Sequence, residues 1–192
     1  MSIAQSTWEA LTRDAYLALL WSLSYPGRAH TLPAGSDAGS WANESAFLTI
    51  AHTLLDLETS FFCPDHPVAQ RLSESGARER RVEDAAYVFL PVLDAQAIAL
   101  IECVKVGTFA NPDKGATIIT SASFDSGALM TWSGPGIQTP RRVMLDVPSP
   151  FWDARAARIR YPLGIDVYFA DHNRVIGLPR TTLVDLGSTE VR

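Results

Sequence analysis

The stretch from Tyr161 to Asp185 decides the fold, and it reads YPLGIDVYFADHNRVIGLPRTTLVD. Two apolar runs, 165–170 and 175–178, flank the polar turn 171–173. Runs rich in β-branched and aromatic residues on either side of a turn rich in Asp and Asn predict a β-hairpin. Asn173 is expected to take the positive φ that a tight reversal needs, because asparagine adopts it at modest cost.

Polar residues stand at both ends of this hairpin. Asp166 lies at the start of the first run, and the segment Pro179-Arg180-Thr181-Thr182 closes the second. A hairpin brings its two ends together, so Asp166 and Arg180 are expected to face each other across its base. Such a pair is typical of a binding or catalytic site, of a salt bridge that stabilises the hairpin, or of an interface. The residues alone leave all three interpretations open.

Length and composition predict one globular domain over residues 1–192, and the alternation of strands and helices described below predicts an α/β fold. A chain of 192 residues can bury a large single core. Hydrophobic residues make up 47% and charged residues 19%, which is typical of a globular protein and argues against disorder. The net charge of −5 gives no support for nucleic-acid binding, which needs concentrated positive charge. Cys63 and Cys103 are far apart and form no C-x-x-C pair, so no disulfide framework is predicted.

The N-terminus has no apolar segment behind a basic start, and no apolar run approaches the length of a membrane span. We therefore expect a cytoplasmic protein with no membrane partner.

The first predicted helix is unusually apolar. Ser6 and Glu9 stand in capping-box spacing at its start, and Pro26-Gly27 ends it. Apolar residues surround this helix almost completely, which predicts burial on more than one side, in the core or against another chain. A loop is expected over Thr31–Ser40, and a second helix should begin with Asn43 as its N-cap.

Strands and helices alternate in the next part of the chain. A short strand is expected at 59–63 before a helix capped by Asp65, and another strand at 85–92 before a helix capped by Asp94. The mixed-sign run 78–84 between them is expected to be a solvated surface turn. Strand, helix, strand in that order predicts a crossover connection and a sheet with parallel pairs.

The middle of the chain predicts a meander that returns to a final helix. Its glycine-rich turns are not typical of phosphate loops, because a strand and not a helix follows them. The predicted parts, in order, are a strand at 116–121, a reversal at Asp125-Ser126-Gly127, a strand at 128–132, a turn at 133–136, a strand at 143–147 and a helix at 151–159 that begins after Ser149-Pro150.

The sequence contains no recognisable catalytic set. No G-x-S-x-G nucleophile elbow, G-x-G-x-x-G or Walker motif occurs. Lys105 and Lys114 each stand beside a predicted turn, where a lysine is usually solvated and not a Schiff-base former. The histidines lack the spacing of metal ligands, and they are His30, His52, His66 and His172. We therefore predict no catalytic residue, no cofactor and no metal.

Two quoted segments resemble a known family. Tyr161-Pro162-Leu163-Gly164-Ile165-Asp166 followed by Leu178-Pro179-Arg180-Thr181-Thr182 resembles the C-terminal motif of the H subunit of the bacterial carbon–phosphorus lyase system. One departure is Leu17 after Tyr16, where the family commonly carries an arginine. Further matches occur in the expected order, at Ser24-x-Pro26-Gly27, Asp56-x-Glu58-Thr59, Asn111-Pro112-Asp113-Lys114-Gly115-Ala116-Thr117 and Ser133-Gly134-Pro135-Gly136-Ile137.

This resemblance implies a fold and a role that spacing does not show. It implies a mixed sheet between helices, similar to pyridoxal-phosphate-dependent transferases but without the cofactor and its lysine. It implies a homodimer in isolation, and in the cell an assembly with the G, I and J subunits. That assembly, with an ATP-binding-cassette-like partner, takes part in forming ribose 1-methylphosphonate 5-triphosphate from ATP and methylphosphonate. The resemblance implies that this chain is a required subunit of that transferase without independent activity.

The C-terminal motif is then expected to shape the chain and dock a partner rather than to catalyse. Its candidate functional or interface residues are Pro162, Gly164, Asp166, Arg180, Thr181 and Thr182. The alternative is a free-standing anion-binding protein or transferase that uses Asp166 and Arg180.

Overall fold

A seven-stranded mixed sheet, with strand order β1-β9-β8-β5-β4-β2-β3, forms the centre of the protein, and a three-stranded sheet, β10-β6-β7, lies beside it. The computed structural model describes residues 3–33 and 43–187, and only the backbone of 3–8. The helices are α1 (Ile3–Ser24), α2 (Glu44–Leu54), α3 (His66–Ser73), α4 (Ala95–Ile101), α5 (Ser149–Ala157) and the 3-10 helix η1 (Pro112–Lys114). The strands are β1 (Ala29–Thr31), β2 (Ser60–Phe62), β3 (Arg78–Glu79), β4 (Tyr87–Leu90), β5 (Thr117–Ser121), β6 (Ser123–Gly134), β7 (Ile137–Asp146), β8 (Asp166–Asp171), β9 (Arg174–Leu178) and β10 (Leu183–Asp185).

The predicted C-terminal hairpin is confirmed as β8 and β9. The two strands pair in antiparallel register from Val167 opposite Leu178 to Asp171 opposite Arg174. The expectation of positive φ at Asn173 is wrong, because His172 takes it, with φ 53°. The reversal needs the left-handed region at one of its two loop residues, and here the first residue provides it.

The predicted crossover connection is also confirmed. β2 pairs with β4 in parallel, with α3 between them in the chain, and β4 pairs with β5 in parallel, with α4 between them. β5 then pairs in parallel with β8, which makes the hairpin part of the main sheet. Asp65 and Asp94 cap α3 and α4 as expected, since their carboxylates accept hydrogen bonds from Val68 N and Ala97 N.

The expected meander is wrong in its first reversal. Asp125-Ser126-Gly127 does not turn the chain but forms a bulge inside β6, with φ 61° at Asp125 and 76° at Gly127. β5 therefore joins the main sheet, and the antiparallel pair is β6 with β7, which reverses at Pro135-Gly136. Positive φ suits a bulge as well as a turn, so the pattern alone could not separate the two.

Three N-terminal expectations also need correction. α1 begins at Ile3, so Ser6 lies inside the helix and is not its cap. Ala29–Thr31, which overlaps the expected loop, forms edge strand β1; residues 34–40 of that loop lie outside the described chain. Asn43 is the N-cap of α2 but makes no capping bond with its side chain. A three-residue edge strand carries too little pattern to be seen in sequence.

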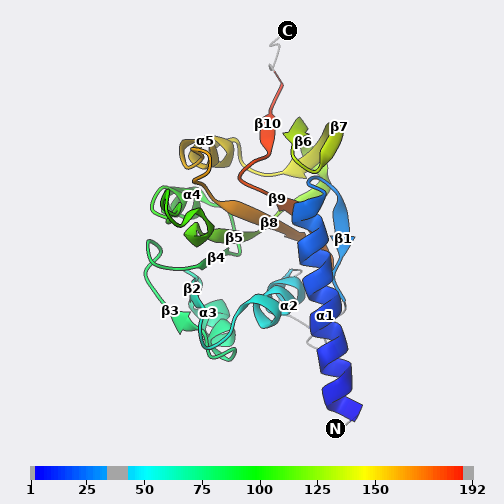
Figure 1. The fold of residues 1–192 in the computed structure, drawn as a ribbon, viewed down its shortest axis with the longest axis vertical. Coiled ribbons are helices and arrows are strands. Elements are labelled where there is room, and N and C mark those ends of the chain that lie inside the picture. The colour runs from blue at the N-terminus through cyan, green and yellow to red at the C-terminus, as the bar shows by residue number, and fades with distance from the viewer. Residues whose placement is uncertain (1–2, 34–42, 188–192) are drawn as a thin grey trace.

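The hairpin lies between α4 and α5 on one side and α1 and α2 on the other (Figure 1). Its alternate residues face two different cores. Val167 and Phe169 pack with α4, α5 and the smaller sheet, whereas Tyr168 and Ala170 pack with α1, α2 and α3. This is the period of two expected of a strand. Because both faces of β8 are covered, its sequence is a continuous apolar run and not an alternation of apolar and polar residues.

Helix α1 approaches the hairpin very closely at Gly177. A Cβ built there would lie 2.6 Å from the carbonyl carbon and oxygen of Ser22. The Tyr168 hydroxyl donates a hydrogen bond of 3.4 Å to the carbonyl of Leu19 on the same helix. Glycine at this point lets the helix backbone rest directly on the sheet.

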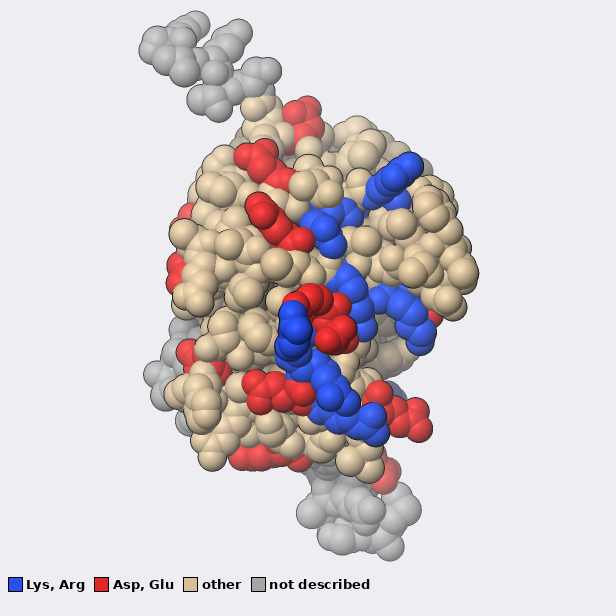
Figure 2. All heavy atoms as spheres, turned by 90° about the vertical axis from the view of Figure 1, so that its left-hand side faces the viewer, with Lys and Arg blue, Asp and Glu red and all other residues tan. Residues whose placement is uncertain are grey.

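The mixed-sign run at 78–84 is exposed at the edge of the sheet, apart from Val82. Figure 2 shows basic and acidic side chains next to one another on this side of the molecule. A surface turn was expected there, and two of its residues form strand β3, which pairs with β2. Among the described residues, no helix is long and apolar enough to cross a membrane.

Candidate functional site at the base of the hairpin

Asp166 and Arg180 form a closed pair at the base of the hairpin. The Arg180 side chain donates to Asp166 Oδ2 through Nη2 at 2.7 Å and Nε at 3.2 Å, and its backbone N–H donates to Asp166 Oδ1 at 2.7 Å. Nη1 donates to the carbonyl oxygen of Pro112 at 2.6 Å. The side chains are only 14% and 21% exposed. Each guanidinium nitrogen of Arg180 is therefore already engaged within the chain.

Two glycines make room for this pair. A Cβ at Gly115 would lie 2.3 Å from the Gly164 carbonyl oxygen and 2.9 Å from Arg180 Nη1. A Cβ at Gly164 would lie 3.0 Å from the Cβ of Arg180. Arg180 thus fills the space between the segment before β8 and the loop before β5. The position of Gly164 in the family motif follows from this packing.

The other candidate residues of the motif are Pro162, Thr181 and Thr182. Pro162 and Thr181 are half-buried, and the Tyr161–Pro162 peptide bond is cis. Thr182 is buried, with 2% of its surface exposed, and its hydroxyl has no hydrogen-bond partner in the described chain. The structure therefore brings Asp166, Arg180 and Gly164 into one cluster, and the Thr182 hydroxyl forms no hydrogen bond with it.

Thr182 instead lies beside Arg155, a buried arginine on α5 that sequence reasoning did not single out. Arg155 is 5% exposed, and its Nη2 donates to the carbonyl oxygens of Pro179 at 2.9 Å and Thr182 at 3.2 Å. Burial lowers the pKa of Arg155 to about 10, with the charge of Asp166 acting in the opposite direction. Its position in the predicted helix was the sequence signal for this burial, because residue 155 lies on the same helix face as Phe151 and Trp152.

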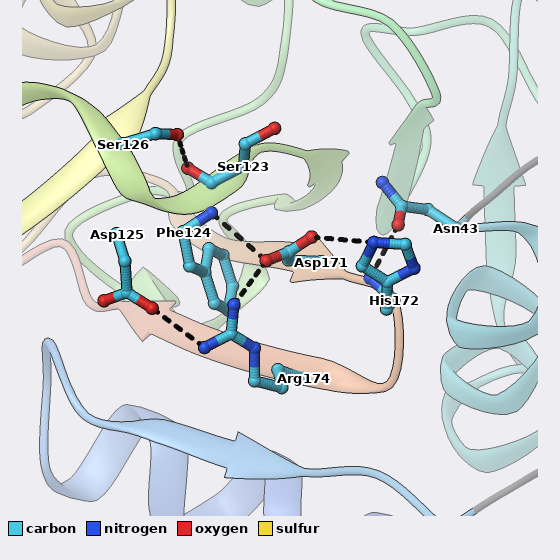
Figure 3. A network of polar contacts seen from close by, with 8 residues as sticks. All are labelled: Asn43, Ser123, Phe124, Asp125, Ser126, Asp171, His172 and Arg174. Atoms are coloured by element: carbon cyan, nitrogen blue, oxygen red, sulfur yellow. Dashed lines mark hydrogen bonds and ion pairs between the residues drawn. The ribbon is translucent and has the colours of Figure 1, made fainter.

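The tip of the hairpin is held by a second polar network (Figure 3). Asp171 accepts hydrogen bonds from Arg174 Nη2 at 2.6 Å and from the Phe124 backbone N–H at 3.2 Å. Arg174 also donates to Asp125 at 3.0 Å and lies over the ring of Phe124. The Asn43 side chain accepts from the backbone N–H of the turn residue His172 at 2.7 Å. The Asn43 side chain, which makes no capping bond to α2, therefore holds the turn of the hairpin.

Ligands of α/β proteins often bind at the carboxyl ends of parallel strands. There, a cavity of about 240 Å³ follows β2 and β4, and Asp65 and Asp94 line it. Both carboxylates already cap helices, as described above. Within residues 3–33 and 43–187, no group of His, Cys, Asp and Glu side chains could hold a metal ion.

These features define a mixed α/β domain whose C-terminal hairpin is locked at its base and its tip. A family model described as "Bacterial phosphonate metabolism protein (PhnH)" matches residues 7–185. The chain is also 31% identical over 185 residues, which is 93% of this chain and 89% of the relative, to a protein of Stutzerimonas stutzeri described as a C-P lyase subunit, HtxG. The chain therefore belongs to the PhnH family, which confirms the resemblance seen in its C-terminal motif.

Proposed function

We propose that this chain is an accessory subunit of a carbon–phosphorus lyase core assembly. In this role it is required for forming ribose 1-methylphosphonate 5-triphosphate from ATP and methylphosphonate in the breakdown of organic phosphonates. The match to the PhnH family over residues 7–185 carries the proposal. The closed Asp166–Arg180 pair supports an accessory role, because it offers substrate no free guanidinium nitrogen.

The proposal includes the partners that the family resemblance implies. The chain forms a homodimer in isolation and joins the G, I and J subunits in the cytoplasm, with residues 1–192 acting as one domain. Its fold is related to pyridoxal-phosphate-dependent transferases, without the cofactor. The motif residues Pro162, Gly164 and Thr181 shape the segment that docks a partner.

Co-purification tests the assembly directly. A tagged chain expressed together with the G, I and J subunits under phosphate starvation is expected to bring down all three. An unrelated tagged protein should bring down none. If the chain never joins these subunits, the accessory role is wrong.

The alternative is a free-standing anion-binding protein or transferase that uses Asp166 and Arg180. The isolated chain would then turn over ATP in the presence of methylphosphonate. We expect no turnover, because Arg180 is saturated by Asp166 and Pro112. Turnover that disappears in Arg180→Lys would favour the alternative.

An exposed apolar surface on α1 supports the proposed homodimer. Trp21 and Tyr25 stack at 5.6 Å between ring centroids, and each is more than 40% exposed. Leu17 is 39% exposed and adds apolar area where the family commonly carries an arginine. The full apolar surface consists of Tyr16, Leu17, Leu20, Trp21 and Tyr25. A contiguous surface of this kind is typical of an interface.

Replacing Trp21 with glutamate is expected to convert the dimer to a monomer. A charge at the centre of an apolar interface would lose its hydration without gaining a partner, weakening association by about 100-fold. Sedimentation across a concentration series measures the change. Phe109→Glu is the matched control, since Phe109 is 68% exposed outside this helix and should leave association unchanged. An unaltered dimer in the Trp21 variant would place the interface elsewhere.

A further inference from the structure

A cavity of about 430 Å³ lies between α5 and β10. Most of its wall is apolar, with Trp152, Ile159 and Leu183 among the lining residues. Its polar lining residues are Asp153, Arg155 and Thr182. The volume lies within the range of pockets that hold small molecules, and an apolar wall with a few polar groups is typical of them.

Arg155 brings a buried positive charge to this cavity. No carboxylate within residues 3–33 and 43–187 forms a salt bridge with it, and both of its hydrogen bonds use Nη2 alone. Its Nε is buried and has no partner in the described chain. A buried cation with an unused donor is costly unless an acceptor binds that donor.

Thr182 places a second unused polar group in the same wall. Its hydroxyl is buried without a partner among the described residues, although its carbonyl accepts a hydrogen bond from Arg155. Two such groups beside each other need an explanation, because buried polar atoms in proteins are almost always hydrogen-bonded. A guanidinium and a hydroxyl can together bind the oxygens of one oxyanion.

The nearby acidic groups do not take over this role. Asp153 lines the cavity but is exposed, so water screens its charge. Asp166 is engaged by Arg180, as described above. Among the described residues, neither carboxylate forms a hydrogen bond or a salt bridge with Arg155.

We propose that this cavity binds a small organic oxyanion, meaning a carboxylate, phosphate or phosphonate group attached to an apolar group. Arg155 and Thr182 bind the oxygens, and the side chains of Trp152, Ile159 and Leu183 contact the apolar part. This goes beyond the accessory role proposed above, because it assigns a ligand to this chain by itself. It does not depend on assembly with other subunits.

Thermal unfolding of the full chain at constant ionic strength tests the proposal, since a ligand that binds the folded state raises the midpoint. The probes are benzoate and phenylphosphonate, with benzamide as the uncharged analogue of benzoate. At least one of the two anions is expected to give a saturable rise in the midpoint, and benzamide is expected to bind about tenfold more weakly than benzoate or not at all.

Thr182→Val is the decisive variant, because it removes a hydroxyl that has no partner and so should not lower the stability of the unliganded chain. We expect it to weaken anion binding about tenfold, and Arg155→Met to abolish binding. Arg142→Gln is the control, since Arg142 is exposed on β7 and should not change binding. The proposal is overturned if neither anion gives a saturable shift, or if Thr182→Val binds as the unaltered chain does.

Discussion

Replacing Asp166 with alanine is expected to lower the free energy of unfolding by about 3 kcal/mol, because it leaves a largely buried arginine unpaired. Arg180 would lose its charge partner, and its backbone N–H would lose its acceptor. The pair also joins the start of β8 to the loop before β5 through the Pro112 carbonyl oxygen. Urea unfolding followed by circular dichroism measures the change.

An exposed ion pair provides the control for this prediction. Arg13 and Asp14 are bonded at 2.9 Å, but their side chains are 69% and 54% exposed. Asp14→Ala should therefore change the free energy of unfolding by less than about 0.5 kcal/mol. Equal losses in the Asp14 and Asp166 variants would show that the pair at the hairpin base is not structural.

A double variant separates the pair from the rest of the motif. Asp166→Ala combined with Arg180→Ala is expected to lower the free energy of unfolding by less than the sum of the two single changes. The reason is that each single change leaves the other side chain without its partner. If the motif shapes a docking surface, Arg180→Ala should also reduce recovery of the G, I and J subunits in co-purification. Intact assembly by a stably folded Arg180 variant would separate the motif from docking.

Replacing Gly177 with alanine is expected to cost about 3 kcal/mol or more, because the new Cβ would meet backbone and not a movable side chain. That Cβ would lie 2.6 Å from the carbonyl oxygen of Ser22 and 2.7 Å from the backbone nitrogen of Leu23. The whole of α1 would have to move off the sheet. Urea unfolding measures the loss, and sedimentation shows whether displacement of the helix also weakens the proposed dimer.

Gly187→Ala is the comparison for this change, because a Cβ there would meet nothing within 4 Å. Gly187 has φ 69°, so its substitution should cost about 1 kcal/mol from backbone strain alone. If Gly177→Ala costs no more than that, close contact between α1 and β9 does not stabilise the fold.

The sequence by itself determined those features that depend on neighbouring residues. The hairpin followed from two apolar runs around a polar turn, and the caps of α3 and α4 followed from aspartates placed before apolar periods. The parallel pairing of β2 with β4 followed from the strand–helix–strand order, because such connections return to the same sheet. Family membership followed from the motif around Asp166 and Arg180, whose residues were matched directly.

The tertiary structure decided what depends on distant segments. Asp125-Ser126-Gly127 became a bulge and not a turn, because β6 pairs with β7 on both sides of it. Asp166 and Arg180 were expected to meet, but only the packing of Gly115 and Pro112 shows that Arg180 has no free guanidinium nitrogen. Arg155 was not singled out from the sequence, and it lies buried beside Thr182 where α5 and β10 line one cavity. A residue's chemistry can be read from its letter, but its burial is fixed by segments far away in the chain.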